Sequence, residues 1–502
     1  MKQKDRRKLQ NRKRRIDRRL LPRQWPNQPR PMFAASNIQY EISGRARGVR
    51  AGGLGAIHLL ARHIGLVKML DQVLHLLKRH LPYHESDHVL NIVYNLMAGN
   101  DCLDDLDLLR QDEAYTDLLG AQRIPDPTTA GDFLRRFSAS DVIALLDGIN
   151  QIRRRIWLTL PAAERKLAII DADGTDAPTE GEKKSGMDIS YKGIWGYSPL
   201  LISLANFQEP LFLINRPGNA VSHEGAAEWI DRAITLCEGA FEEILLRGDT
   251  DFSLMTHFDR WTERKAKFVF GVDARPNMVA LAEELPEYRF RPLTRRAPYE
   301  IATEPRERRE NVKEQIVKER EFENIRLVSE QVAEFMYRPT KCIREYRVVV
   351  LRKNLSVEKG EKHLFDDVRY FFYITNDLRL AMEDVVFHAN RRCNQENLIE
   401  QLKNGVNALR VPVYDLLSNW AYMVIASLAW TLKAWFALTL PRAEDRTAVL
   451  RMEFKRFLNA LIQVPAQVIR GGHRILLRLQ GYTRWLRLLF VCLETAAALR
   501  SG

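Results

Sequence analysis

The stretch LAIIDAD, residues 167–173, decides the fold class, because it is a short apolar run that ends on two carboxylates. Such a run predicts a buried strand. Working outward, YSPLLISLANFQEPLFLINRPGN (197–219) predicts a hairpin, and AAEWIDRAITLCEGA (226–240) predicts a helix. EILLRGDTD (243–251) and KFVFGVDA (267–274) predict two more strands. With a second helix between these last strands, the order predicts an α/β fold with a mixed sheet and helices on its faces.

The flanking regions have other periodicities. Residues 53–160 carry apolar side chains at helical spacing, and GLGAIHLLARHIGLVKMLDQVLHLL is the clearest case. Residues 277–375 interrupt the α/β pattern with three strand-like segments, and a further helix is predicted from about Val385 to Leu409. The chain then ends in apolar and basic segments predicted to be helices, of which residues 473–499 form the longest, with a break or bend at Gly481 as the alternative.

The net charge of +13 is concentrated at the start of the chain. Residues 1–30 hold 13 Lys/Arg and two Asp, a balance of +11, so the remainder carries only +2. This arm is predicted to contact phosphates through Arg12, Lys13, Arg14 and Arg15, and a solubility tail is the alternative.

Two further features bound the class of protein. Residues 416–432 are nearly uncharged but too short and too isolated to favour a membrane span, so we expect a buried core helix and no membrane partner. The five cysteines are odd in number and show no CxxC spacing. They favour a reducing cytoplasm and argue against structural zinc or a disulfide framework.

Three acidic residues occupy positions where such a fold builds sites. Asp173 (IIDADGT) and Asp249 (LLRGDTD) end predicted strands, and Glu396 (NRRCNQENLIEQLKNG) lies on the predicted later helix. Converging carboxylates can hold Mg²⁺, which prefers hard oxygen ligands. By position alone an Asp at a strand end equally often caps a helix or shapes a turn.

The helix around Glu396 carries a recognisable spacing. Arg392, Glu396 and Lys403 read R-x3-E-x6-K, which resembles the Tyr/Arg/Glu/Lys signature of DDE insertion-sequence transposases with a β-rich insertion. The DGT at Asp173 and GDTDF at Asp249 are similar to that family's first two acidic motifs. The resemblance covers roughly residues 53–500 in architecture. It departs where Ala389 replaces the signature tyrosine, which puts that tyrosine's DNA contact in doubt.

The resemblance implies a chemistry and a set of roles. Asp173, Asp249 and Glu396 would bind two Mg²⁺ ions, with Mn²⁺ as a substitute, while Arg392 and Lys403 would contact DNA near the scissile phosphate. The reaction would be cleavage at transposon ends followed by strand transfer into target DNA. Double-stranded DNA would be the partner, a homodimer the expected assembly on it, and the bacterial cytoplasm, at the nucleoid, the expected location.

The same resemblance gives the sheet an RNase H-like character and divides the chain into parts. These are a basic arm and linker (1–36), a helical N-terminal DNA-binding domain (37–160), the first part of the catalytic core (161–276), a β-rich insertion (277–375), the second part of the core with the Glu396 helix (376–412), and C-terminal helices (413–502).

Each acid has a rival nearby. Asp171 shares a strand face with Asp173, and Asp251 stands two residues after Asp249. Glu400 lies one turn beyond Glu396. The motif context favours the first choice in every pair and leaves the alternative open.

Secondary DNA contacts are predicted at Arg470, Arg474 and Arg478, which recur every four residues as a basic helical stripe. Trp195 and Tyr197 flank a turn near Asp173 and are predicted to pack, with base stacking as the alternative. Two rival functions share these features, a transposase-derived DNA-binding protein and an RNase H-like nuclease that cuts without joining. No P-loop, GxSxG or HExxH motif supports another chemistry.

Overall fold

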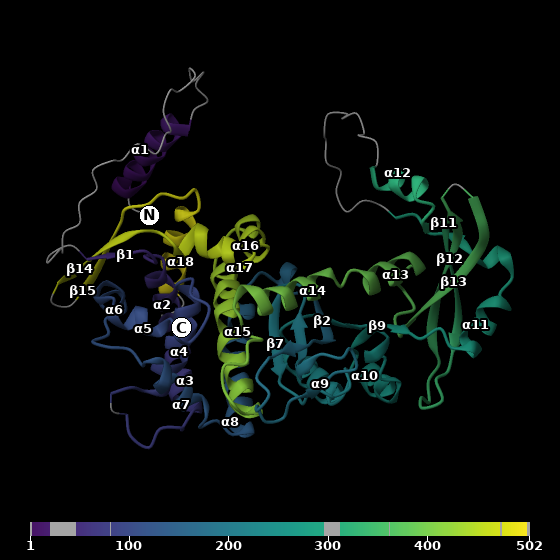
Figure 1. The fold of residues 1–502 in the computed structure, drawn as a ribbon, viewed down its shortest axis with the longest axis horizontal. Helices are drawn as coiled ribbons and strands as arrows, with labels where there is room; N and C mark the ends of the chain where they lie inside the picture. The colour runs from purple at the N-terminus through teal and green to yellow at the C-terminus, as the bar shows by residue number, and fades with distance from the viewer. Residues whose placement is uncertain are drawn as a thin grey trace.

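A computed structural model gives the fold of the chain (Figure 1). It describes residues 3–20, 47–80, 82–295, 312–360, 362–471 and 474–498. The predicted linker up to residue 36 lies outside these ranges from residue 21 onward.

The centre is a nine-stranded mixed sheet with the order β10-β11-β12-β13-β9-β8-β2-β6-β7. Its five core strands are β2 (Leu167–Gly174), β6 (Leu200–Leu204), β7 (Glu209–Ile214), β8 (Glu243–Gly248) and β9 (Lys267–Val272). β2 pairs antiparallel with β6 and parallel with β8, and β8 pairs parallel with β9. The predicted mixed α/β sheet is therefore confirmed.

The predicted β-rich segment continues this sheet. It contributes β10 (Arg291–Pro292), β11 (Glu323–Tyr337), β12 (Tyr346–Lys359) and β13 (Lys362–Thr375). β13 pairs antiparallel with β9, from Phe372 opposite Val272 to Thr375 opposite Val269. The long strands at the right of Figure 1 thus extend outward from the core sheet.

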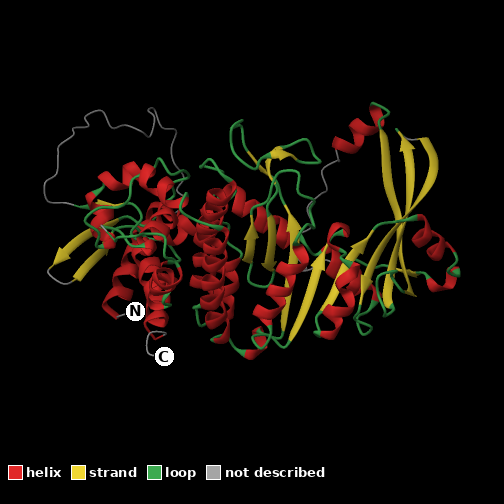
Figure 2. Ribbon diagram, turned by 90° about the horizontal axis from the view of Figure 1, so that it is seen from below, coloured by secondary structure: helices red, strands yellow, loops and turns green. Residues whose placement is uncertain are grey.

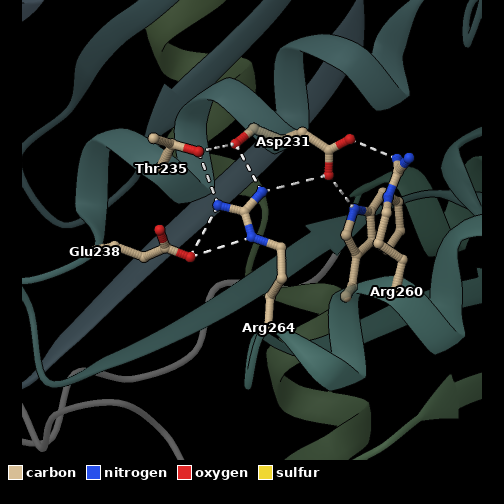
Figure 3. Close-up of polar contacts among 6 residues, drawn as sticks. Asp231, Thr235, Glu238, Arg260 and Arg264 are labelled. Carbon is tan, nitrogen blue, oxygen red and sulfur yellow. Dashed lines mark hydrogen bonds and ion pairs between the residues drawn. The ribbon is translucent and has the colours of Figure 1, made fainter.

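Helices cover both faces of the core strands. α9 (Ala226–Cys237) and α10 (Phe258–Glu263) share one apolar cluster with inward residues of β2 and β8, whereas α13 (Met382–Asn390) packs with Leu245 and Val269 on the opposite face. Figure 3 shows how Arg264, just after α10, is held against α9: its guanidinium lies 2.8 Å from Glu238 Oε1 and 2.8 Å from Thr235 Oγ1. This polar cluster fixes one helix to the other.

A helical part lies at the other end of the molecule (Figure 2). It contains α2 (Leu54–His63), α3 (Leu66–Val73), α4 (Glu85–Met97), α5 (Leu106–Gln111), α6 (Glu113–Leu119), α7 (Pro127–Leu134), α8 (Ala139–Leu158) and, from the C-terminal region, α15 (Leu416–Leu438). Among the described helices, α15 alone is long and apolar enough to cross a membrane, and its apolar window is wholly buried in the protein. That burial is what we expected of a core helix.

Smaller elements complete the described chain. They are α1 (Gln3–Leu20), β1 (Gly48–Val49), β3 (Ala177–Pro178), β4 (Asp188–Ile189), β5 (Trp195–Tyr197), α11 (Pro276–Glu283), α12 (Val312–Glu319), α14 (Cys393–Glu400), α16 (Ala443–Leu450), α17 (Phe454–Phe457), β14 (Ala466–Gly471), β15 (Arg474–Leu479) and α18 (Leu486–Ala498). β3, β4 and β5 form a separate small sheet directly after β2.

The prediction of one long C-terminal helix from residue 473 is wrong at its start. Residues 474–479 are strand β15, which pairs antiparallel with β14, and the helix α18 begins only at Leu486. Leu477 and Leu479 are the partly buried side chains of β15, and their spacing of two residues is that of one face of a strand. The basic helical stripe of Arg470, Arg474 and Arg478 therefore does not exist, since these residues lie on two strands of a hairpin.

The predicted helix from Val385 to Leu409 is also interrupted. α13 ends at Asn390, Arg392 caps the start of α14, and a π-helical turn covers Gln401–Gly405. The break matters because it lies within the signature spacing.

Candidate active site

Two of the predicted acids meet at one edge of the core sheet. Parallel pairing sets Asp171 of β2 opposite Arg247 of β8, so Asp173 and Asp249 each lie two residues further along neighbouring strands. Asp173 is the penultimate residue of β2, and Asp249 follows the last residue of β8. The ends of two neighbouring parallel strands thus bring both carboxylates to the same edge of the sheet, as the strand pattern predicted.

A single guanidinium spans both carboxylates. Nη2 of Arg392 lies 3.1 Å from Oδ2 of Asp173, and Nη1 lies 3.7 Å from Oδ2 of Asp249. The same Nη2 donates to the carbonyl oxygen of Ala172 at 3.3 Å. Arg392 is able to reach this far because it precedes α14 as its N-terminal cap. The two carboxylates thus share one cation.

The electrostatics of the pair favour a positive partner. The pKa of Asp173 is raised to about 6, mainly by burial and also by the neighbouring carboxylates of Asp249 and Asp171, while Arg392 acts in the opposite direction. Keeping the Asp173 carboxylate ionised therefore costs free energy unless a cation lies beside it. Asp249 also caps a short 3-10 turn, since its Oδ1 accepts the backbone N–H of Asp251 at 3.1 Å.

Glu396 occupies the first turn of α14, one turn after Arg392, and is exposed. Within the described residues, three potential ligands converge within 4.8 Å only at His80–His84–Glu85 and Asp101–Cys102–Asp105. The structure therefore gathers Asp173 and Asp249 around Arg392, while Glu396, in the first turn of α14, does not complete such a group with them.

Lys403, the last residue of the predicted signature, lies in the π-helical turn and is half-buried. Burial lowers the pKa of this amine, Lys192 lowers it as well, and the carboxylates of Asp176 and Asp173 act against this. Lys192 itself is 3.4 Å from Asp176. Lys403 therefore belongs to the charged surroundings of Asp173, as Arg392 does. Ala389, at the tyrosine position, packs at the margin of the α13 core.

The rivals of the three acids are differently engaged. Both oxygens of Asp171 accept from Arg247 at 2.7 Å, and this carboxylate is fully buried. Glu400 accepts a hydrogen bond of 2.7 Å from Asn404, and Asp251 is exposed. Asp171 thus has no oxygen left without a strong partner, a distinction that alternation along the strand could not make.

The predicted basic residues outside the sheet gather at one place. Arg12 of α1 donates to the carbonyl oxygens of Leu479 at 3.0 Å and Gly481 at 2.7 Å, so α1 lies against the β14–β15 hairpin (Figure 1). The following residues Lys13, Arg14 and Arg15 are exposed on α1. The basic residues of the N-terminal arm and those of the C-terminal segment, predicted separately, therefore lie on elements that contact each other.

The arginines of the hairpin differ in their partners. Arg470 pairs with Asp117 of α6 at 3.0 Å, and Arg478 donates to Gln467 at 3.2 Å. Arg474 is exposed, and within the described chain it forms no ion pair. Only part of this basic surface is therefore free of internal partners.

The two aromatic residues predicted near Asp173 differ in their burial. Tyr197 is buried and its hydroxyl donates to the carbonyl oxygen of Ser185 at 2.7 Å, so it packs as predicted. Trp195 is 38% exposed on β5.

Arg247 was not among the predicted site residues. An arginine inside the apolar strand EILLRG was nevertheless a visible signal of a buried ion pair.

Comparison with known proteins gives a match over nearly the whole chain. A family model described as "Transposase DDE domain group 1" matches residues 31–501. A solved structure, the cryo-EM structure of piggyBac transposase synaptic complex with hairpin DNA, is 11% identical, covers 82% of this chain and 84% of its own, and has a TM-score of 0.32. At that score the likeness carries no argument about this fold. No curated protein matches the chain.

Proposed function

Since the chain belongs to the DDE transposases, we propose that it cleaves DNA at the ends of a transposable element and joins the freed 3′-hydroxyl to target DNA. The observation that carries the proposal is the meeting of Asp173 and Asp249 around one cation at the ends of adjacent parallel strands. We also propose that strands β7-β6-β2-β8-β9 form an RNase H-like core. Their mixed order, with the acids at its centre, supports this.

The donor chemistry of the site fits divalent metal. Asp173 and Asp249 offer hard carboxylate oxygens, and the raised pKa of Asp173, about 6, supports a role for added positive charge at this site. Asp173, Asp249 and Glu396 would hold the metal, proposed as two Mg²⁺ with Mn²⁺ as a substitute. When bound, such ions activate a water or 3′-hydroxyl on one side of a phosphodiester and stabilise the leaving oxygen on the other.

The remaining groups of the site bind and orient the substrate. Arg392 presents a planar fork that matches the oxygens of a phosphate, and Lys403 adds a second positive charge beside Asp173. We propose that they hold the phosphates on either side of the scissile bond. Both reaction steps are direct displacements, so the chain needs no Ser, Tyr or Cys nucleophile.

Double-stranded DNA is the partner that follows from this reaction. We propose that α1 and the β14–β15 hairpin contact its backbone, through Lys13, Arg14, Arg15 and Arg474, because these basic side chains are exposed and lie together. Two transposon ends must be brought together, so a homodimer on DNA is proposed. The bacterial cytoplasm, at the nucleoid, remains the proposed location.

The test compares Mg²⁺-dependent cleavage of DNA carrying the element's own ends by wild type and by Glu396→Gln. Glu400→Gln is the matched control, because this carboxylate is equally exposed one turn further along the same helix. We expect Glu396→Gln to lose cleavage by at least about 100-fold while it still binds DNA, and Glu400→Gln to cut nearly as wild type.

Three outcomes would count against the proposal. If Glu396→Gln cuts as well as wild type, the third metal ligand is wrongly assigned. If wild type binds DNA without cutting it, a DNA-binding derivative is the better description. If it cuts but a 3′-hydroxyl donor end gives no joined product, the protein is a nuclease without strand transfer.

A further inference from the structure

A second ion pair lies directly beneath the two candidate metal ligands. Arg247 of β8 donates from Nε to Oδ1 and from Nη2 to Oδ2 of Asp171 on β2, each at 2.7 Å. The side chains are only 3% and 0% exposed. A bidentate Arg–carboxylate pair fixes both the separation and the angle of the groups that it joins. It therefore sets the relative position of the two strands at this level of the sheet.

The position of this pair is specific. Asp171 stands two residues before Asp173, and Arg247 stands two residues before Asp249, in matched register. Residues two apart on a strand share a face, so the ion pair and the candidate ligand Asp173 lie on the same side of the sheet.

The same guanidinium reaches a third element. Nη1 of Arg247 donates to the carbonyl oxygen of His388 at 3.2 Å, near the end of α13. Four residues later Arg392 begins the turn that leads into α14 and Glu396. One side chain thus touches each of the elements that lead into Asp173, Asp249 and Glu396.

We propose that Arg247 is a positioning residue for the metal site, because it holds together β2, β8 and the α13–α14 segment, the elements that carry the three candidate carboxylates. This inference rests on the proposed function. Mg²⁺ demands near-ideal octahedral geometry at short distances, so it is sensitive to small displacements of its ligands. Partners that orient metal ligands typically contribute 10- to 100-fold in metal affinity or activity (order of magnitude).

The chain supplies a matched control for ordinary stabilisation. Arg153 of α8 donates to Glu209 of β7 at 3.0 Å, and these side chains are 1% and 0% exposed. This pair is as buried as Arg247–Asp171 but joins elements that carry no candidate ligand. Lysine cannot reproduce the bidentate fork in either pair. Arg247→Lys and Arg153→Lys should therefore lose stability alike and differ only at the metal site.

The experiment measures metal binding and cleavage separately. Mn²⁺ is titrated into DNA-free protein and the free ion is followed by electron paramagnetic resonance, while cleavage of the element's ends is compared in Mg²⁺ and in Mn²⁺. For Arg247→Lys we expect Mn²⁺ affinity or Mg²⁺-dependent kcat to fall about 10- to 100-fold with unchanged DNA affinity, and the ratio of Mn²⁺ to Mg²⁺ activity to rise. Arg153→Lys should keep the wild-type affinity and ratio.

Each result decides something. Wild-type metal affinity and a wild-type Mn²⁺/Mg²⁺ ratio in Arg247→Lys would overturn the inference. If wild type binds Mn²⁺ but cuts no DNA, the proposed function fails while the binding titration still tests the role of Arg247. If Arg247→Lys does not fold, the apolar pair Asp171→Leu with Arg247→Met replaces it, since apolar side chains often substitute for a buried ion pair. That double variant should show the same loss of metal affinity, and a wild-type affinity would overturn the inference.

Discussion

Replacing Asp173 by Asn should stabilise the metal-free protein and abolish the proposed cleavage activity. Burial and two neighbouring carboxylates raise the pKa of Asp173 from 3.8 to about 6, although Arg392 opposes the change. That difference corresponds to about 3 kcal/mol of unfavourable free energy for the ionised form, at about 1.4 kcal/mol for each pKa unit. Asn has nearly the same shape and stays neutral. At pH 8 the free energy of unfolding of the variant should therefore exceed that of wild type by up to about 3 kcal/mol.

The sign follows from linkage between protonation and folding. Because the pKa of Asp173 is higher in the folded than in the unfolded chain, the folded state holds the proton more tightly between pH 3.8 and about 6. The free energy of unfolding of wild type should therefore fall as the pH rises through this window, and the loss is complete above it. The advantage of Asp173→Asn should be largest at pH 8 and smaller at pH 5.

The assay is urea unfolding at pH 5 and pH 8 in the presence of a chelator, then at pH 8 with added Mg²⁺. Added Mg²⁺ should stabilise wild type and leave Asp173→Asn almost unchanged, since a ligand stabilises only the state that binds it. Asp251→Asn, an exposed carboxylate beside the site, is the control and should gain nothing. An Asp173→Asn variant no more stable than wild type at pH 8, or equally favoured at both pH values, would refute the reasoning.

Three other predictions test the structure away from the candidate metal ligands. Glu209→Gln should lower the free energy of unfolding by about 3–5 kcal/mol in urea titrations, because it leaves the buried charge of Arg153 without its partner. Lys433 is buried and burial lowers its pKa well below the ordinary value, so wild type should gain stability as the pH rises toward 10 and Lys433→Met should flatten that dependence in thermal melts. Arg474→Ala should reduce the slope of log DNA affinity against log salt by about one, whereas Arg470→Ala should change it less because that side chain is already paired within the protein.

The core strands were predictable because they are short apolar runs between polar boundaries. LAIIDAD corresponds to β2 at Leu167–Gly174, and KFVFGV corresponds to β9 at Lys267–Val272. The pairing of β13 with β9 was not predictable, since it joins residues about a hundred positions apart and leaves no local pattern. The register between distant strands depends on the whole sheet. The sequence pattern predicts only which residues of one strand share a face.

The C-terminal hairpin shows how local spacing can mislead. Arginines every four residues suggested a helix, yet the partly buried residues of the segment, Leu477 and Leu479, have the two-residue spacing of a strand. Charged side chains on a surface element carry little information about period, because either structure leaves them in solvent. The spacing of the buried residues is the better guide to secondary structure, and in this segment it favours a strand.

The acidic residues of the candidate site were named from the sequence, but the contacts of these residues with their partners were not. Alternation gave Asp171 and Asp173 equal claims and the motif context favoured Asp173, but the bidentate contact of Asp171 with Arg247 could not be predicted. A partner 76 residues away in the chain cannot be assigned by counting along a strand. Which of two neighbouring carboxylates is already paired depends on contacts between distant strands, and the sequence pattern does not show such contacts.

The break between α13 and α14 gives the signature spacing a physical meaning. In a continuous helix Arg392 would be fixed beside Glu396 on one face, but here it precedes the first turn of α14, and its Nε is buried with no hydrogen-bond partner in the described structure. The guanidinium is therefore incompletely satisfied while it spans Asp173 and Asp249. Divalent metal would compete for the same oxygens, and a side chain outside the regular helix can turn from them toward a phosphate without unwinding α14. Arg392 is thus suited to neutralise the carboxylates before the reaction and to bind DNA during it.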